Sequence, residues 1–416
     1  MTQSKHDIGA LRAQFPALQQ KQVFLDNAGG SQILGAAADS YAKHLGTMIR
    51  DYLITSNVQM GGSYDASQTA AKKVNKGYEA GSRYINALPD EIVYGASSTQ
   101  LLRNLALGLT FAEGDEIIVS ALDHEANIAP WLDLAERQGL GIRFWNPEGH
   151  DNNPKLTVES LKPLLSNRTK FLAFTHTTNL LGSIHDVKAI TTAAHEYPNV
   201  LVCVDGVAYA PHRSVDVKDL GVDFYCLSWY KVFGPHISML YASREAQKEI
   251  RPLCHYFNPS ETLSDKASFA AGSYELIASI PTVVDHISEH GWEGSVKQET
   301  QIQTMLLDYL SKREDITIYG EPRADAESRV PIVSFTVEGW NSRSVVAAIE
   351  ANSNIGLKHG HFYSHRLITE VLDLDAADGV VRVSMAHYNT REEIETVIST
   401  LEDVIVKKSQ VGKNGK

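Results

Sequence analysis

Residues 200–243 read VLVCVDGVAYAPHRSVDVKDLGVDFYCLSWYKVFGPHISMLYAS. Three runs in this stretch, at 200–205, 223–228 and 237–241, are short and rich in β-branched and aromatic residues, which predicts buried strands. The interval between the first two runs has room for one helix. Because a helix separates these two strands, they are expected to run parallel in a sheet that helices cover on both faces.

The same alternation of strands and helices extends through the preceding half of the sequence. Four further runs predict strands at 91–94, 116–120, 141–145 and 170–175. Amphipathic stretches predict helices at 100–110, 129–138, 158–165 and 187–196. The sequence therefore predicts an α/β domain with a mostly parallel seven-stranded sheet. In such sheets, ligands bind at the carboxyl ends of the strands.

The pattern changes near Gly272, where a smaller α+β unit begins. A long helical stretch at 274–313 is expected, with interruptions around Gly291 and Gly294. A last helix is expected from Thr390, which forms a capping box with Glu393. Between these helices the sequence predicts a strand at 332–337, a helix at 342–352 and a strand at 380–385.

This change of pattern predicts two domains. We assign residues 26–275 to a large domain, and residues 1–25 together with 276–408 to a small one. The last residues, SQVGKNGK at 409–416, are polar and predict a disordered tail.

Composition argues against several classes of protein. The 416 residues carry a formal net charge of −12, which disfavours binding to nucleic acid. No apolar run approaches about 18 residues, and the first residues lack the apolar core of a signal peptide, so we expect no membrane span and a cytoplasmic location. Cys203, Cys226 and Cys254 are scattered and form neither a disulfide framework nor a metal-binding pair. No metal site is expected.

Two ionisable residues follow predicted strands in the opening stretch. Lys231 comes just after the strand at 223–228, and in a closed pocket such a lysine can lose its proton and become a nucleophile. An ordinary lysine is a solvated side chain instead. Asp205 can cap a helix, or it can pair with a protonated ring nitrogen of a cofactor. Ser228 and Tyr230 add hydroxyls near Lys231 that can hold a phosphate.

Five further motifs follow one another along the chain. They are FLDNAGGS (24–31), GASSTQLLRNLALGL (95–109), LDHEANIAPW (122–131), HTTNLLGS (176–183) and VRVSMAHYNTREEI (381–394). With these motifs the chain resembles the class V aminotransferase superfamily of fold-type I pyridoxal-phosphate (PLP) enzymes, and within it the cysteine-desulfurase-like branch. The resemblance covers nearly the whole chain. It implies that PLP is bound as an imine of Lys231 and that the substrate is an amino acid.

The resemblance also implies roles for individual residues around the cofactor. His124 is expected to stack on the pyridine ring and relay protons, and Asp205 to keep the ring nitrogen protonated. Asn179 is expected near the phenolic oxygen, where the alternative is an ordinary turn residue. Phosphate contacts are expected from Thr99, Gln100, Ser228, Tyr230 and, lent by a second subunit, Gly272 and Ser273. Active sites shared in this way imply a homodimer.

Substrate contacts are implied in the C-terminal part of the chain. Arg382 matches an arginine that clamps the substrate carboxylate with two parallel hydrogen bonds, and the alternative is a surface ion pair. His361 and Tyr363 form a polar cluster with Lys358 and His359. This cluster can supply an acid or a substrate contact, or it can be a solvated turn.

Three positions depart from the desulfurase pattern. Tyr363 stands where desulfurases have the cysteine that carries sulfur, and the C-terminal third of the chain contains no cysteine. Ala208 replaces a glutamine that bonds the phenolic oxygen, and Tyr209 or His212 are the candidate substitutes. Tyr230 replaces a histidine. Because a persulfide forms only on a thiolate, these changes predict a subgroup that lacks the catalytic cysteine.

These observations favour one function over its alternatives. β-Elimination of a sulfur or selenium substituent needs no cysteine nucleophile, so we expect a C–S or C–Se lyase. Transamination and epimerisation depend on the same residues and are the alternatives. A non-catalytic PLP-binding scaffold is less favoured, because Lys231, Asp205 and Arg382 are all present.

Overall fold

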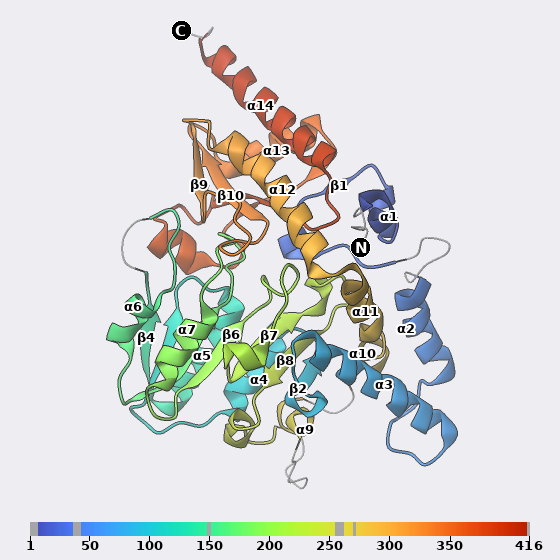
Figure 1. Cartoon of the computed structure of the whole chain (residues 1–416). Helices are drawn as coiled ribbons and strands as arrows, with labels where there is room; N and C mark the ends of the chain where they lie inside the picture. Colours follow the sequence, from blue (N-terminus) through green and yellow to red (C-terminus); the bar gives the residue numbers. More distant parts are fainter. Residues whose placement is uncertain (1–6, 36–42, 148–150, 254–261, 269–271, 414–416) are drawn as a thin grey trace.

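The computed structural model describes residues 7–35, 43–147, 151–253, 262–268 and 272–413 (Figure 1). Within these residues, seven strands form one sheet in the order β2-β8-β7-β6-β5-β3-β4. They are β2 (Ile92–Gly95), β3 (Glu116–Ser120), β4 (Gly141–Trp145), β5 (Thr169–Thr175), β6 (Leu201–Asp205), β7 (Phe224–Ser228) and β8 (Ser238–Ala242). β8 is antiparallel to β7 and β2, whereas the strands from β4 to β7 pair in parallel. The predicted α/β fold and its seven strands are confirmed.

One face of this sheet packs against α4 (Ser98–Gly108) and α5 (Ala129–Gln138). Their cluster contains Trp131 from α5 and Phe171 and Phe224 from the strands, all with no exposed surface. Successive strand residues point to opposite faces, so this cluster takes every second residue of each strand. α4 is held by this packing at the edge of the sheet where the strands end.

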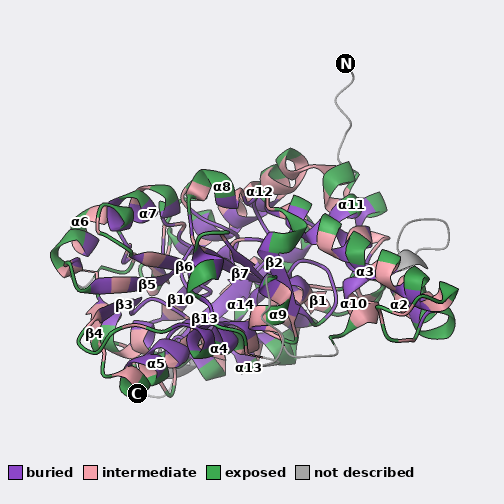
Figure 2. Ribbon diagram, turned by 90° about the horizontal axis from the view of Figure 1, so that it is seen from below, coloured by how far each residue is buried: buried purple, intermediate pink, exposed green. Residues whose placement is uncertain are grey.

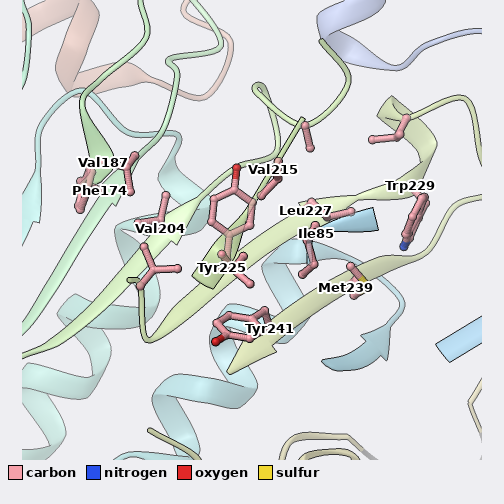
Figure 3. Packing of buried hydrophobic residues seen from close by; sticks show 14 of the residues in the cluster. Ile85, Phe174, Val187, Val204, Val215, Tyr225, Leu227, Trp229, Met239 and Tyr241 are labelled. Carbon is pink, nitrogen blue, oxygen red and sulfur yellow. The ribbon is translucent and has the colours of Figure 1, made fainter. Parts of the chain in front are cut away.

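The opposite face packs against α3 (Asp65–Tyr84), α7 (Val187–His195) and α11 (Ile280–His290). Figure 3 shows part of this second cluster, with Tyr225 and Leu227 of β7 on the same face of the sheet. Helices on both faces leave the strands buried, and Figure 2 shows buried residues at the centre and exposed residues on the outer sides of the helices. This burial on both faces explains why the strands are continuous runs of apolar residues in the sequence.

The helix predicted at 158–165 is shorter in the structure. It consists of α6 (Val158–Leu161) and a 3₁₀ turn at Lys162–Leu164. Pro163 lacks the backbone N–H that a continued α-helix would use, which explains the change. The other helices are α1 (Ile8–Arg12), α2 (Lys43–Thr55), α8 (Val217–Leu220), α9 (Leu263–Ala267) and those of the C-terminal part.

The helical stretch at 274–313 is divided into three helices, α10 (Tyr274–Ile277), α11 and α12 (Trp292–Leu310). The break predicted at Gly291 is confirmed, and this residue has the left-handed φ of +70°. The break predicted at Gly294 is wrong, because Gly294 lies in the first turn of α12. One glycine costs a helix only about 1 kcal/mol relative to alanine, which the long helix tolerates.

A second sheet of the described residues has four antiparallel strands in the order β12-β13-β10-β9. The strands are β9 (Ile316–Tyr319), β10 (Ile332–Val337), β12 (Lys358–Gly360) and β13 (Val380–Ser384), and α13 (Ser342–Asn352) and α14 (Arg391–Lys413) pack beside them. In Figure 1 this unit lies at the top of the molecule and the seven-stranded sheet lies below it. The predicted elements are confirmed here, while β9 and β12 were not predicted.

α14 continues to Lys413, so the structure describes residues 409–413 as helical, and the disordered tail at 409–416 stays a prediction. Thr390 and Glu393 form the predicted capping box, with reciprocal bonds of 3.0 and 3.2 Å. Once such a helix has started, each added residue gains one backbone hydrogen bond, so a polar sequence without proline continues it. Residues 414–416 lie outside the described residues.

The N-terminal segment packs with the C-terminal unit. β1 (Val23–Phe24) pairs in parallel with β11 (Ile355–Gly356), and Leu25 is buried in the same cluster as β10 and β13. This agrees with placing residues 1–25 in the small domain, although the limits of the two domains stay a prediction. Among the described helices, none combines the length and apolar character needed to cross a lipid bilayer.

Candidate active site

A pocket lies where β5, β6 and β7 end and α4 begins, the edge that the sequence predicts for ligand binding. Six predicted site residues line it, namely Thr99, His124, Asn179, Asp205, Tyr230 and Lys231. Ser97, Ser98, Ala126, Thr175, Thr177, Val207 and Ala208 complete the lining. Residues that are up to about 130 positions apart in the sequence thus surround one cavity, because parallel strands deliver them to the same edge.

Lys231 is the last residue of a 3₁₀ turn, Trp229–Lys231, that follows β7. Its side chain is buried, and its Nζ lies 5.8 Å from the centre of the Tyr230 ring. Burial lowers the pKa of Lys231 to about 8; Asp205 opposes this shift, while the Arg382 cation adds to it. About a tenth of the amine is therefore unprotonated at pH 7, far more than in an ordinary lysine, and the neutral form is the nucleophile.

Asp205 is the last residue of β6 and is buried. Its Oδ1 accepts a hydrogen bond of 2.9 Å from the backbone N–H of Val207. Burial raises the pKa of Asp205, and this N–H and the Lys231 cation work in the opposite direction. A buried carboxylate in this position is suited to pair with a cationic N–H group, which would restore its charged form.

Asp123 is a second buried carboxyl group that the sequence analysis missed. Its Oδ1 accepts a 2.6 Å bond from Asn127 Nδ2, and its Oδ2 accepts a 3.0 Å bond from the N–H of Thr175. Burial raises the pKa of Asp123 to about 8; the bond from Asn127 opposes this shift, while the charge of Asp205 contributes to it. Asp123 is thus mainly neutral at pH 7. Its position directly before His124 in the sequence could have identified Asp123 as a candidate site residue.

His124 forms one wall of the pocket. Its Nδ1 accepts a 3.0 Å hydrogen bond from the backbone N–H of Ala126, which places the proton of the neutral ring on Nε2. Burial lowers the pKa of His124 to about 4, and the cations of Lys231 and Arg382 contribute. The ring is therefore neutral at physiological pH and presents a flat, weakly polar surface.

The first turn of α4 supplies another wall. Ser97 caps the helix, since its Oγ accepts a bond of 3.1 Å from the N–H of Gln100, so the helix starts two residues before the predicted start. Ser98 and Thr99 line the pocket next to it. Free backbone N–H groups and the helix dipole make such an N-terminus suitable for a phosphate. Ser97 and Ser98 were not among the predicted phosphate contacts.

Four predicted phosphate contacts lie outside this pocket lining. Gln100 Oε1 accepts a 2.8 Å bond from the N–H of Ala96, and Gln100 lines a neighbouring cavity together with Gly272 and Ser273. Ser228 is fully buried, and its hydroxyl is 2.8 Å from that of Ser238. The phosphate roles of these residues stay predictions.

Ala208, at the position of the family glutamine, lines the pocket. The two candidate substitutes contact other groups. Tyr209 stacks on His176 with ring centres 3.5 Å apart, and His212 Nδ1 lies 2.9 Å from Glu299 Oε1. The wall at Ala208 is consequently apolar.

Asn179 joins the pocket to the segment 361–364. Its Nδ2 donates a 2.9 Å bond to the carbonyl of Phe362, and its Oδ1 accepts a 2.8 Å bond from Ser364 Oγ. Phe362 and Tyr363 both have left-handed backbones, with φ of 49° and 60°. Residues with a Cβ are uncommon in this region, so the bonds to Asn179 help to hold an unfavourable turn.

The turn brings Tyr363 next to His124, which lines the pocket. The ring of Tyr363 is 69% exposed, and its centre lies 5.3 Å from that of His124. The Tyr363 N–H donates a 3.1 Å bond to His361 Nδ1, and its carbonyl accepts from the N–H of Glu125. The predicted polar cluster thus reaches the pocket through Tyr363, with His361 supporting the turn.

Arg382 lies in the middle of β13 and is only 2% exposed. Its NH2 forms a 2.7 Å ion pair with Asp26 Oδ1, and its NH1 donates a 3.0 Å bond to the carbonyl of Asn179. Its guanidinium also lies 3.8 Å from the centre of the Phe362 ring. The Arg382 end of this ion pair is buried, whereas Asp26 is 24% exposed. Asp26 is a partner that the sequence analysis missed, although it belongs to the FLDNAGGS motif.

The donor set of the pocket fits PLP. An amine of lowered pKa can bind the aldehyde, a buried carboxylate can face the ring nitrogen, and a neutral imidazole can lie against the ring. The start of α4 offers N–H groups and hydroxyls for the phosphate.

Comparison with known proteins identifies the family. The family model for aminotransferase class V matches residues 23–397. The chain belongs to the class V aminotransferase family. The aminotransferase-like protein FGM3 of Gibberella zeae is 49% identical over 97% of this chain and 100% of its own length. The cysteine desulfurase-like protein ustD of Aspergillus flavus is 38% identical, over 96% of this chain and 91% of its own.

A solved structure shares the fold. The apo cysteine desulfurase from Thermococcus onnurineus matches with a TM-score of 0.86 at 23% identity, over 98% of this chain and 100% of that one. The match to the family model and the cysteine desulfurase-like relative confirm the predicted resemblance, and with it PLP as the cofactor. The chain is a PLP-dependent enzyme, so the alternative of a non-catalytic scaffold is set aside.

Proposed function

We propose that this enzyme is a C–S or C–Se lyase that removes a sulfur or selenium substituent from the β-carbon of an amino acid. The observation that supports this most is the pocket itself, which Lys231, Asp205 and His124 line together, with the ring of Tyr363 next to that of His124. PLP supplies the electron sink that makes the α-proton of a bound amino acid acidic. The protein has to bind the substrate, move this proton and let the β-substituent leave.

Individual side chains can perform these steps. The Lys231 amine, with its lowered pKa, is suited to take up and return the α-proton. The neutral ring of His124 shields one side of the reacting atoms and carries a proton on Nε2. Arg382 is the candidate for the substrate carboxylate, and Asp205 for the ring nitrogen. Tyr363 and His361 border the site as candidate contacts to the departing substituent.

The cysteines support elimination over persulfide transfer. Cys203 and Cys226 have no exposed surface and lie within β6 and β7. Burial raises the pKa of both thiols well above the usual value, which disfavours thiolates. Cys254 lies outside the described residues. A tyrosine in the turn next to the site cannot accept sulfur, so the sulfur would leave directly.

Transamination is the second candidate, because a relative that is 49% identical is named as aminotransferase-like. Epimerisation needs the same groups. Transamination exchanges the amino group, whereas epimerisation returns a proton to the opposite face of the α-carbon; neither reaction loses the β-substituent. The products separate the three reactions.

We also propose that the enzyme is a cytoplasmic homodimer. Gly272 and Ser273 are exposed in the single chain and share a cavity with Gln100 at the start of α4. A second subunit that contributes these residues to the phosphate would complete the site. Dimerisation predicts a mass of about twice 45.8 kDa in solution, which light scattering measures.

The function is tested by recording visible spectra of the purified protein before and after adding cysteine, cysteine sulfinate and alanine separately. The parent should be yellow, one amino acid should shift its band, and cysteine should release pyruvate and sulfide. Lys231→Ala should lack the band. Keto acid formation only when a second keto acid is supplied would replace lyase by aminotransferase. Protein that stays colourless with PLP would contradict both proposals.

A further inference from the structure

Two cations, Lys358 and Arg382, share the carboxylate of Asp26. Lys358 and Arg382 are directly opposite each other in the register of β12 and β13. Asp26 lies between them, with Oδ1 2.7 Å from Arg382 NH2 and Oδ2 3.2 Å from Lys358 Nζ. Like charges in directly opposite strand positions repel. Asp26 therefore offsets that repulsion, and two positive charges still face a single negative charge.

Arg382 has partners at two of its three guanidinium nitrogens, and Nε has no hydrogen-bond partner among the described residues. A substrate carboxylate that forms two parallel hydrogen bonds must therefore displace one of these partners. Phe362 covers the face of the guanidinium, the Asn179 carbonyl occupies NH1, and Asp26 occupies NH2. Of these three groups, Asp26 is the one with the charge that a substrate carboxylate would replace.

Asp26 also has space into which it can move. Its side chain is 24% exposed and borders a cavity of about 790 Å³ that Lys358 lines as well. Although Asp26 is the N-cap residue of the turn Asn27–Gly29, its carboxylate makes no capping bond there. Leaving Arg382 would therefore break one ion pair without disrupting the turn.

We propose that Asp26 is a placeholder for the substrate carboxylate, which displaces it from Arg382 and leaves it paired with Lys358. The inference rests on the proposed role of Arg382 in binding an amino acid substrate. The exchange balances charge, because two cations then face two carboxylates. Lys358 is 65% exposed and can follow Asp26 toward solvent. A carboxylate is required for the exchange, so amino acid amides would bind poorly.

The test measures the dissociation constant of L-alanine from the absorbance of the holoenzyme, together with KM and kcat for the best substrate. Asp26→Asn keeps the shape of the side chain but removes the competing charge. Alanine binding should tighten and KM should fall by about tenfold, the equivalent of one charge-assisted hydrogen bond, with little change in kcat. The dissociation constant of alanine amide should be the same in Asp26→Asn as in the parent.

Lys358→Gln should act in the opposite direction. The displaced Asp26 would lose its second partner, so KM should rise by about two- to fivefold, the range of an exposed ion pair. Lys188→Gln is the matched control, because Lys188 is 60% exposed and pairs with Asp219 on the surface. Lys188→Gln should change neither the dissociation constant of alanine nor KM.

Opposite signs for the two variants support the placeholder. A rise of KM in both would mean that Asp26 only orients Arg382 and would overturn the proposal. Because Lys358 is exposed, Lys358→Gln decides the question even if Asp26→Asn does not fold: an unchanged KM there overturns the proposal. Absence of any spectral shift with amino acids in the parent would instead contradict the proposed function.

Discussion

The two sides of the active site differ in how they are built. On the sheet side, Asp205 and Lys231 follow directly from strand ends, and buried neighbours on both faces fix their positions. On the other side, Phe362 and Tyr363 lie in a turn with left-handed backbones, held by bonds to Asn179. The first side carries the groups that we propose for the cofactor. The second carries Tyr363, a departure from the desulfurase pattern, so reaction specificity is expected to reside there.

The largest expected effect is on the sheet side. Asp205→Asn removes the carboxylate that we propose keeps the ring nitrogen protonated, so kcat should fall by about 10²- to 10³-fold while PLP stays attached to Lys231. The measurement is kcat at saturating substrate, with the visible band as proof of cofactor content. Asp123→Asn is the matched control. Because the Asp123 carboxyl has a pKa of about 8, it is mainly neutral at pH 7 and resembles an amide.

Asp123→Asn should therefore cost less than about tenfold in kcat, the range of one altered hydrogen bond. An equal loss in the two variants would show that the buried carboxyls act as one unit, and that the position of Asp205 at a strand end is not the cause.

The next effect concerns pH. The apoprotein should incorporate PLP faster as pH rises, because only the neutral amine of Lys231 attacks the aldehyde. Burial places the pKa of Lys231 at about 8. The rate should rise about tenfold per pH unit below this value and level off above it. Absorbance after mixing apoprotein with PLP between pH 6 and 9.5 measures this. A rate that keeps rising toward pH 10 would mean that burial does not lower the pKa of the Lys231 amine.

These two predictions concern residues that could be placed from the sequence, and the reason is physical. A strand buried on both faces is recognisable as an apolar run, and the residue after it must emerge at the sheet edge. Asp205, Lys231 and the start of α4 follow from this rule. Asp26 and Asp123 do not, since their partners depend on contacts between distant segments. The left-handed turn at Phe362 and Tyr363 likewise cannot be predicted from the sequence, because neither phenylalanine nor tyrosine favours that backbone conformation.

A smaller effect is expected where Asn179 joins the two sides. Asn179→Ala removes the bonds to Phe362 and Ser364, and the turn should lose its position next to the pocket. KM should rise by about three- to tenfold, the equivalent of one or two net hydrogen bonds, with a smaller change in kcat. Faster hydrogen exchange at 361–364 is the independent readout. Ser364→Ala, which removes a single bond, should show about half of the effect in free energy.

An unchanged exchange rate in Asn179→Ala would mean that packing of Phe362 on Arg382 is sufficient to hold the turn. In that case the two sides of the site would be coupled through the guanidinium of Arg382 rather than through the side-chain amide of Asn179.

The smallest effect is on the backbone at Tyr363 itself. With a φ of 60° and a ring that is 69% exposed, this residue contributes strain and little buried area. Tyr363→Asn should raise the free energy of unfolding by about 0.5 kcal/mol, because asparagine tolerates the left-handed region. Tyr363→Val should lower it by about 1 kcal/mol, because a β-branched side chain does not. Both variants lose the ring next to His124, so a matching loss of activity with opposite changes in stability would assign the activity to the ring and the difference in stability to the strained backbone. Equal stability of the two would show that the turn relaxes freely, and the contrast between a fixed sheet side and a strained loop side would not hold.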